Sequence, residues 1–384
     1  MVWPFRRPEA AARDLLVVAG EASGDRALAA VLSALPDVKA FGMGGLALEG
    51  TGADVLFDMR ELSAMGVGDV LMRARPVTTA FTRLLAAARD HRPRAALLVN
   101  YTEFNLRLAA RLKARGIRVL WYIAPQIWAW RAGRADVIAK VVDKLAVILP
   151  FEEALWRSHG VDARYVGCPA LETKLLDRDE ARRKLDLTPR APTIAILPGS
   201  RAHEVERLLA PMLGAYEIVR RERASLDARV LLAPSLVGDV RSSALAAARA
   251  ARVPVCAVSP DEGAAPLLSA FDVAFSASGT ASLEATLAGA LPIIVYRTGL
   301  GTELAARALL RTEHLALPNV LLNRRAFPEL LQRDVTPKRL AATLADLLDR
   351  PAEAAAAAAE VRATLGGKDH PSREVAAMVR ELLQ

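Results

Sequence analysis

Short apolar segments alternate along this chain with longer, alanine-rich amphipathic segments, and this alternation restricts the possible folds more than any other feature. Apolar runs of about four to eight residues are typical of buried strands, and strands that alternate with helices form a mostly parallel sheet covered on both faces. The apolar runs occupy residues 15–19, 95–99, 118–123, 144–149 and 163–166, and then 193–197, 229–233, 254–258, 272–275 and 292–296. Because the pattern restarts after residue 169, we predict an α/β protein with two doubly wound, Rossmann-like domains that face a cleft.

The same pattern predicts the domain boundaries. We expect an N-terminal domain over residues 1–168, a C-terminal domain over residues 169–350, and a helical tail over residues 351–384 that packs back on the N-terminal domain. The 384 residues are enough for each of the two domains to bury its own core.

Glycine-containing turns follow two strands of the second half. Residues 197–204 read Leu-Pro-Gly-Ser-Arg-Ala-His-Glu, which predicts a strand end, a tight turn and a helix start. Such a turn leaves N–H groups unpaired at the positive end of the helix dipole, where a phosphate binds well, and Arg201 can add a bidentate clamp. A similar turn spans residues 276–284. Since Glu204 and Glu284 follow the two turns, we interpret the pair as a nucleoside diphosphate site.

The first predicted strand leads into another turn, residues 19–25, which reads Ala-Gly-Glu-Ala-Ser-Gly-Asp. Gly20 and Gly24 do not fit the G-x-G-x-x-G fingerprint of dinucleotide sites. Two interpretations remain open here, a ligand-facing loop and a plain connection from strand to helix. The acidic groups of Glu21 and Asp25, in a turn of otherwise small residues, favour a ligand.

An aromatic segment lies at residues 121–130, where three tryptophans and a tyrosine occur in a chain with only 5% aromatic residues. Its rings could stack on a sugar or an acyl chain, and Gln126 or Arg131 could add polar contacts. A packed domain edge explains the segment equally well, so both interpretations stay open.

Composition narrows the partners and the compartment. The formal net charge of +8 can attract nucleic acid, anionic lipid or phosphorylated substrates. The sequence has no arginine run interleaved with aromatic residues and no zinc spacing, so we predict no nucleic-acid partner and no metal or other cofactor. Two cysteines, no membrane-length apolar run and no signal-peptide core together predict a cytoplasmic protein.

Six motifs in this chain occur in the order seen in lipid-A-disaccharide synthases, and the chain resembles that family from about residue 14 to residue 380. The motifs are Ala19–Asp25, Ala124–Arg131, Leu149–Glu152, Leu197–Arg201, Ser278–Glu284 and Leu317–Asn319. The Ser-Gly-Thr…Glu pattern of Ser278–Glu284, taken alone, is shared by many glycosyltransferases that use nucleotide sugars. The aromatic segment together with the first glycine turn is specific to the family.

The resemblance implies a metal-independent, inverting glycosyltransferase of the two-domain B architecture (GT-B). It would join UDP-2,3-diacylglucosamine to 2,3-diacylglucosamine 1-phosphate (lipid X), releasing UDP and forming the lipid A disaccharide 1-phosphate. The N-terminal domain would take the acceptor and the lipid, and the C-terminal domain the UDP-sugar donor. The enzyme would act as a peripheral protein at the anionic cytoplasmic face of the inner membrane, and a homodimer stays open.

Residue by residue, the resemblance places the diphosphate on the turn at 199–201 and on the helix start at 278–280, with Glu284 on the ribose. Asn319 matches a functionally important asparagine of the family. The candidate substrate-binding residues are Gly20, Ser23, Gln126, Trp128, Arg131, Gly199, Ser200, Arg201, Glu204, Ser278, Gly279, Thr280, Glu284 and Asn319.

The catalytic side departs from the family pattern. The family usually has Asp-x-Pro-Asp-Phe-Asn where this chain has Asn100-Tyr-Thr-Glu-Phe-Asn105, and the first aspartate is a leading candidate for the general base. An amide cannot accept the proton of an attacking hydroxyl, so Glu103, Glu21 and Asp25 join Asn100 as candidate catalytic residues. Cys168 also replaces the family's usual histidine.

A membrane-facing segment is predicted at residues 63–75. Its apolar side chains could enter the lipid, and its arginines could meet lipid phosphates. The candidate contacts are Met65, Val67, Val70, Leu71, Arg73 and Arg75. An ordinary amphipathic helix that covers the sheet explains the same pattern.

Three functions remain open at this point. The leading one is an active lipid-A-disaccharide synthase. The second is a related enzyme that uses a different acceptor or is a UDP-sugar epimerase, which Asn100 and Cys168 make worth considering. The third is a non-catalytic protein that binds a nucleotide sugar or a lipid.

Overall fold

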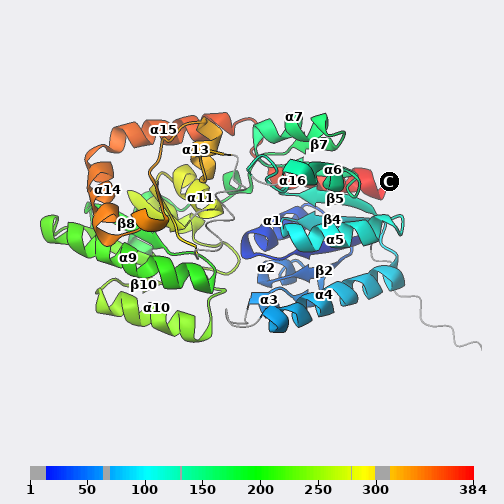
Figure 1. The fold of residues 1–384 in the computed structure, drawn as a ribbon, viewed down its shortest axis with the longest axis horizontal. Helices are drawn as coiled ribbons and strands as arrows, with labels where there is room; N and C mark the ends of the chain where they lie inside the picture. Colours follow the sequence, from blue (N-terminus) through cyan, green and yellow to red (C-terminus); the bar gives the residue numbers. More distant parts are fainter. Residues whose placement is uncertain (1–13, 64–69, 130–131, 278, 299–311) are drawn as a thin grey trace, which may run out of the picture. The chain divides into compact units, whose positions relative to one another are not determined.

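The computed structural model describes residues 14–63, 70–129, 132–277, 279–298 and 312–384. The chain divides into two compact units (Figure 1). Unit 1 comprises the chain up to Ile127, Ala132–Gly167 and His370–Gln384, and unit 2 comprises Cys168–Asp369 together with the short segment that begins at Trp128.

Unit 1 contains a seven-stranded sheet in the order β3-β2-β1-β4-β5-β6-β7, and every neighbouring pair is parallel. Its strands are β1 Leu15–Ala19, β2 Ala40–Gly44, β3 Asp54–Asp58, β4 Ala95–Val99, β5 Arg118–Tyr122, β6 Lys144–Val147 and β7 Asp162–Tyr165. Its helices are α1 Ala22–Ser33, α2 Leu46–Glu49, α3 Arg60–Ser63, α4 Val70–His91, α5 Thr102–Lys113, α6 Ala135–Ala139, α7 Pro150–Ser158 and α16 Pro371–Leu383, with the 3₁₀ turn η1 Ala132–Arg134.

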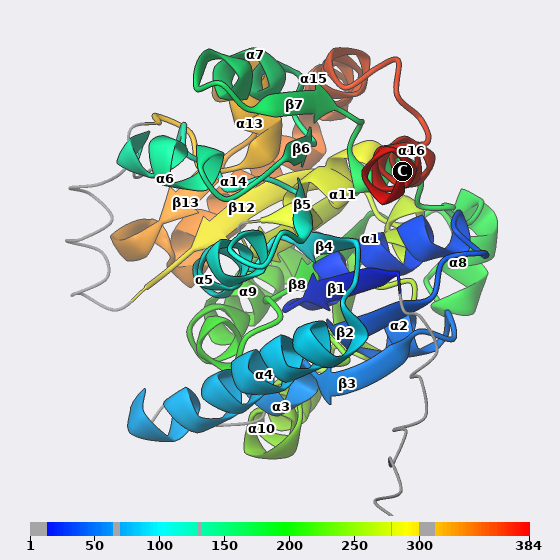
Figure 2. The ribbon, with the colours of Figure 1, turned by 90° about the vertical axis from the view of Figure 1, so that its right-hand side faces the viewer.

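Helices cover both faces of this sheet, as a parallel sheet requires. Leu16, Val18 and Leu98 point into a core shared with α4 and α5. The helices α1 and α16 pack against each other, and both pack against β4. The helix α16 also packs against β5. Figure 2 shows α4 and α5 on one side of the sheet and α1 and α16 on the other.

Unit 2 contains a six-stranded, all-parallel sheet in the order β10-β9-β8-β11-β12-β13. Its strands are β8 Thr193–Leu197, β9 Asp227–Leu231, β10 Val255–Cys256, β11 Val273–Ala277, β12 Leu291–Tyr296 and β13 Glu329–Leu331. Its helices are α8 Arg178–Lys184, α9 Ala202–Glu222, α10 Gly238–Ala250, α11 Thr280–Ala288, α13 Leu317–Leu322, α14 Pro337–Asp349 and α15 Pro351–Thr364, with 3₁₀ turns η2 Pro169–Leu171, η3 Ala265–Ala270 and η4 Gln332–Asp334. Two doubly wound Rossmann-like sheets are therefore present.

All ten predicted strands occur, with boundaries shifted by a few residues. The sequence analysis missed β2, β3 and β13. The strand β2 reads Ala-Phe-Gly-Met-Gly and includes two glycines, which are depleted in strands. The strand β3 begins and ends with aspartate, and β13 has only three residues. Short or glycine-containing strands give no clear apolar run, so pairing with the neighbouring strand decides their conformation.

The last two helices belong to different units. The helix α15 packs against α11, α13 and β12 in unit 2, whereas α16 packs against α1, β4 and β5 in unit 1. Charged contacts help to hold α16: Glu381 accepts from Arg164 Nη1 and from Lys144 Nζ, both at 2.7 Å. These two cations hold the pKa of Glu381 down to about 2, Arg164 having the larger effect.

This ionic contact predicts a pH-dependent contribution to stability. Because the pKa of Glu381 is lowered on folding, its contribution is complete above about pH 4.5 and disappears as the pH falls toward about 2. We expect Glu381→Gln to lower the thermal midpoint near pH 7 by about 1–3 °C, since exposed ion pairs are weak. The difference from the wild type should shrink below about pH 4.5 in calorimetric scans.

The exposed Glu222 at the end of α9 provides the matched control. A Glu222→Gln variant should show no comparable change in the thermal midpoint at either pH. A midpoint difference for Glu381→Gln that stays constant from pH 7 to pH 3 would contradict the assigned role of this carboxylate.

Candidate functional site

The two strands that lead to the predicted phosphate turns lie side by side in unit 2. The strands β8 and β11 are neighbours, with Leu197 paired to Ser276, yet the chain continues from β8 toward one edge of the sheet and from β11 toward the other (Figure 1). Ligands of doubly wound sheets bind outside the carboxyl ends of the strands at this topological switch point. The predicted turn at residues 198–201 follows β8 directly, and Gly279 and the helix α11 come shortly after β11.

An internal carboxylate shapes the first turn. Glu204 Oε2 accepts hydrogen bonds from the backbone N–H groups of Ser200 at 3.0 Å and Arg201 at 3.2 Å. Gly199 has φ +113°, and a Cβ there would lie 2.3 Å from the same oxygen. The expectation that these N–H groups are unpaired is therefore wrong for Ser200 and Arg201, because Glu204 caps the start of α9. Glu204 supports the turn from within.

Two groups at this switch point can still meet a phosphate. The Arg201 side chain is 56% exposed, and its Nη1 lies 3.4 Å from Glu204 Oε1. The helix α11 begins at Thr280, directly after Gly279, whose φ of +129° favours glycine. Glu284 lies one turn further along α11 and is half-buried. Ser278, which the sequence analysis also selected, lies outside the described residues.

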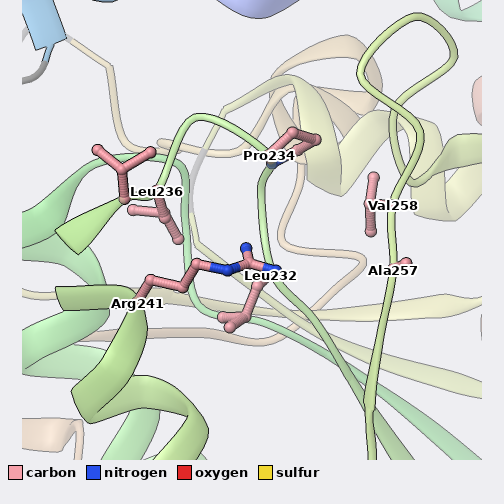
Figure 3. Close-up of a pocket in the computed structure, with 7 residues that line it drawn as sticks. Leu232, Pro234, Leu236, Arg241, Ala257 and Val258 are labelled. Atoms are coloured by element: carbon pink, nitrogen blue, oxygen red, sulfur yellow. The ribbon is translucent and has the colours of Figure 1, made fainter. Parts of the chain in front are cut away.

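Unit 2 also contains an open pocket of about 240 Å³ (Figure 3). It lies at the carboxyl ends of β9 and β10, and Arg241 of α10 points into it. The pocket is lined by Leu232, Pro234, Leu236, Val237, Arg241, Ala257 and Val258. Ser235, from the same loop, donates from its hydroxyl to the carbonyl oxygen of Ser200 at 3.3 Å. One hydrogen bond thus joins the loop beside the pocket to the phosphate turn. Sequence reasoning missed the pocket, whose mainly apolar residues form no motif.

Asn319 has a different environment from the one expected of a substrate contact. It is fully buried, and its Nδ2 group donates to the Phe327 carbonyl at 2.9 Å and to Glu329 Oε1 at 2.8 Å. Its Oδ1 accepts from the Phe327 N–H at 2.8 Å. Glu329 also accepts from the N–H groups of Leu315 and Ala316. Asn319 therefore fixes the segment around α13, and its buried partner Glu329 was not found from the sequence.

The turns of unit 1 also follow neighbouring strands at a switch point, between β1 and β4. Glu21 comes two residues after β1, and Asn100 comes directly after β4. Asn100 Nδ2 donates to Glu21 Oε2 at 3.2 Å. Glu21 is the N-cap residue of α1, but its side chain makes no capping hydrogen bond to that helix.

The backbone around Asn100 is strained. Asn100 and Tyr101 both have left-handed φ angles, +49° and +45°, which cost about 1–3 kcal/mol each in residues other than glycine. Asn105 holds this turn in place, because its Nδ2 group donates to the carbonyl oxygens of Asn100 at 2.8 Å and Val99 at 3.3 Å. The left-handed backbone therefore lowers the stability of the fold, and it holds the Asn100 side chain in one position.

Tyr101 explains the glycine at position 20. Its ring lies so close that a Cβ on Gly20 would come within 2.3 Å of the ring carbon Cγ. The ring also stacks on Phe104, with centroids 5.3 Å apart. Burial, and to a lesser degree the charge of Glu21, raise the pKa of Tyr101 above its ordinary value. Gly20 therefore serves the close packing of this turn, and Tyr101 is a site residue that the sequence analysis passed over.

Two of the predicted catalytic acids are engaged elsewhere. Asp25 is buried and accepts from the N–H groups of Gly45 at 2.7 Å and Ala47 at 3.0 Å, so it caps α2. Burial raises the pKa of Asp25, and these hydrogen bonds oppose that effect. Glu103 is exposed and forms an ion pair with Arg134 at 2.5 Å. Asp25 therefore serves as a cap of α2 in this structure.

The aromatic segment divides between core and surface. Trp121 and Tyr122 belong to β5 and are almost completely buried, so the packing interpretation holds for these two rings. Gln126 and Trp128 are half-buried, as is Ser23 in α1. Arg131 lies outside the described residues.

Of the candidate membrane contacts, Met65 and Val67 lie outside the described residues. Val70, Leu71 and Arg73 belong to the first turns of α4, where only the backbone is described, and Arg75 is exposed. Among the helices that the structure describes, none combines the length and apolar character needed to cross a membrane. Within the same residues, no three His, Cys, Asp or Glu side chains form a group that could hold a metal ion.

Comparison with known proteins places this site in context. The sequence profile of a family described as lipid-A-disaccharide synthetase matches residues 15–380. A lipid-A-disaccharide synthase of Myxococcus xanthus is 43% identical over 335 residues, 85% of this chain and 86% of that protein. Another from Anaeromyxobacter sp. is 43% identical over 367 residues, 94% of this chain and 95% of that protein.

Solved structures with low sequence identity share the fold. The UDP-GlcNAc 2-epimerase of Neisseria meningitidis superposes with a TM-score of 0.67 at 12% identity, covering 96% of this chain and all of that chain. MurG of Acinetobacter baumannii gives 0.54 at 13% identity, covering 96% of this chain and 99% of that chain. These likenesses confirm the predicted GT-B fold class.

The buried pair of Asn319 and Glu329 leads to a stability prediction. Either Asn319→Ala or Glu329→Gln leaves buried hydrogen-bonding groups without a partner, and we expect each to lower the free energy of unfolding by about 1–3 kcal/mol. Denaturant unfolding followed by tryptophan fluorescence measures the change. Glu313→Gln, at an exposed position of the same segment, should have little effect. Unchanged stability of both buried variants would contradict the positioning role of this pair.

Proposed function

The chain belongs to the lipid-A-disaccharide synthase family, and from that premise we propose how its two units divide the reaction. The family match confirms the resemblance predicted from the motifs, and with it a glycosyltransferase of lipid A biosynthesis. The substrates are then UDP-2,3-diacylglucosamine and lipid X. The products are the lipid A disaccharide 1-phosphate and UDP, with inversion at the anomeric carbon.

The main support for a donor-binding site in unit 2 is the pair of predicted turns at the switch point between β8 and β11. Arg201 extends from one turn, and the N-terminus of α11 at Thr280 follows the other. A guanidinium and a helix N-terminus both stabilise phosphate oxygens, so together they can hold the diphosphate and take up the charge of the departing UDP. In this proposal Glu204 and Gly199 maintain the shape of the turn, and Glu284 accepts from the ribose hydroxyls.

We assign the nucleoside base of the donor to the pocket at the carboxyl ends of β9 and β10. The loop that lines it is joined to the phosphate turn by the Ser235–Ser200 hydrogen bond, and its lining is mainly apolar with one arginine, Arg241. A planar base could lie against the apolar side chains, and its carbonyl oxygens could accept from Arg241. A nucleoside diphosphate therefore fits the turn and the pocket as one ligand of unit 2.

In this proposal the acceptor side falls to unit 1 and the donor side to unit 2. Gly20, Ser23, Gln126, Trp128 and Arg131 stay candidate contacts for the acceptor or an acyl chain. Since both substrates are acylated, the enzyme must work at a lipid surface. We place it peripherally on the anionic cytoplasmic face of the inner membrane, with the predicted segment at residues 63–75, which includes the first residues of α4, as the contact.

Product analysis tests the proposed function. Purified protein is incubated in detergent, without added metal, with UDP-2,3-diacylglucosamine and lipid X, and disaccharide and UDP are followed by mass spectrometry. We expect both products in equal amounts. UDP release with a different acceptor only, epimerised donor, or UDP binding without turnover would contradict it in favour of the related enzyme or the non-catalytic protein.

The diphosphate contact can be tested in the same assay. Arg201→Ala should lower kcat/KM for the donor by about 100-fold, because it removes a charge-assisted contact to the diphosphate. Arg221→Ala, an exposed arginine near the other end of α9, is the matched control and should stay within about threefold of the wild type. Equal activity of the two variants would remove Arg201 from the donor site.

A further inference from the structure

The switch point of unit 1 brings one carboxylate and one amide together where the family pattern predicts the reacting hydroxyl. Ligands of doubly wound sheets approach at this edge, and here Glu21 follows β1 while Asn100 follows β4. The Asn100 Nδ2 group donates to Glu21 Oε2 at 3.2 Å. A base for the sugar hydroxyl has to be a proton acceptor, which Glu21 is and the Asn100 amide is not.

The contacts of the two other nearby acids, Asp25 and Glu103, make them less suitable as the general base. Asp25 is 3% exposed and caps α2 through two backbone N–H groups, so a hydroxyl of a substrate cannot reach it without breaking that cap. Glu103 lies in the first turn of α5, and its carboxylate is already engaged in an ion pair with the Arg134 guanidinium.

Glu21 is held in a different manner. The Asn100 amide donates to one of its carboxylate oxygens and thereby orients the carboxylate. The amide itself is fixed, because the left-handed backbone at Asn100 is clamped by the Asn105 side chain. A carboxylate at position 100 would instead place a second negative charge about 3 Å from Glu21, and like charges at that distance raise the pKa of one of the two groups.

We propose that Glu21 is the general base of this enzyme and that Asn100 is its positioning residue, an inference that rests on the proposed function. Glu21 takes the proton from the acceptor's 6-hydroxyl as the oxygen attacks the anomeric carbon of the donor. The bond from that carbon to the diphosphate oxygen breaks, and UDP leaves with the electron pair. The proton ends on Glu21 and is later released to solvent.

The test is the pH dependence of turnover in single variants. Glu21→Gln should lower kcat by about 100- to 10,000-fold, the usual range for a positioned base, and should abolish the acid limb of the kcat/KM profile. Binding of UDP, measured by calorimetry, should stay within about twofold of the wild type, since UDP is held by unit 2. Glu21→Asp, which keeps the carboxylate, should recover part of the rate together with the acid limb.

Variants at position 100 separate positioning from catalysis. Asn100→Ala should lower kcat by about tenfold and keep the acid limb, because the base is still present but less well oriented. Asn100→Asp should move the acid limb to higher pH through repulsion between the two carboxylates. Glu103→Gln serves as the matched acidic control and should stay within about fivefold of the wild type.

Two results would overturn the assignment. One is a Glu21→Gln enzyme that keeps its acid limb and most of its rate. The other is an Asn100→Asp enzyme that gains tenfold or more and no longer needs Glu21. In both cases the wild type still forms the disaccharide, so the result rejects Glu21 as the base and leaves the proposed function standing. Absence of wild-type turnover would reject the proposed function, and the base with it.

Discussion

Internal carboxylates that accept hydrogen bonds from backbone N–H groups are the interaction on which this structure most depends. Every strand of a parallel sheet passes the chain to a helix at the same edge, and the N–H groups exposed there need acceptors. Glu204 accepts from two such groups after β8, Asp25 from two at the start of α2, and Glu329 from two before α13. Each carboxylate gives its turn one defined shape.

This arrangement separates acids that build the site from those that can react in it. Asp25 and Glu329 are buried among backbone donors, and Glu204 is bound to its own turn. Each of these carboxylates therefore already accepts hydrogen bonds from the protein itself. Glu21 meets the side chain of Asn100, and Arg201 extends from a turn that Glu204 already supports. Turns whose shape is set before the substrate arrives lose little entropy on binding, which is the benefit of preorganisation in catalysis.

Much of the fold could be predicted from the sequence, because runs such as residues 15–19 and 95–99 are apolar, short and bounded by turns. Strand β2, with its two glycines, and the three-residue β13 could not, since pairing with neighbours determines them. The glycine turns were found, as each must change chain direction at a strand end. The roles of the acidic residues could not be predicted. Sequence spacing alone does not distinguish a glutamate that caps its own turn, as Glu204 does, from one that faces a ligand.

A crystal structure of the UDP complex tests most directly whether internal carboxylates hold the turns in shape for the ligand. We predict that Glu204 keeps its hydrogen bonds to the N–H groups of Ser200 and Arg201, close to the 3.0 and 3.2 Å seen here. The Arg201 guanidinium should lie on the diphosphate, and the base should occupy the pocket beside Arg241. Phosphate oxygens in place of the Glu204 carboxylate, with Glu204 turned away, would contradict this view of the site.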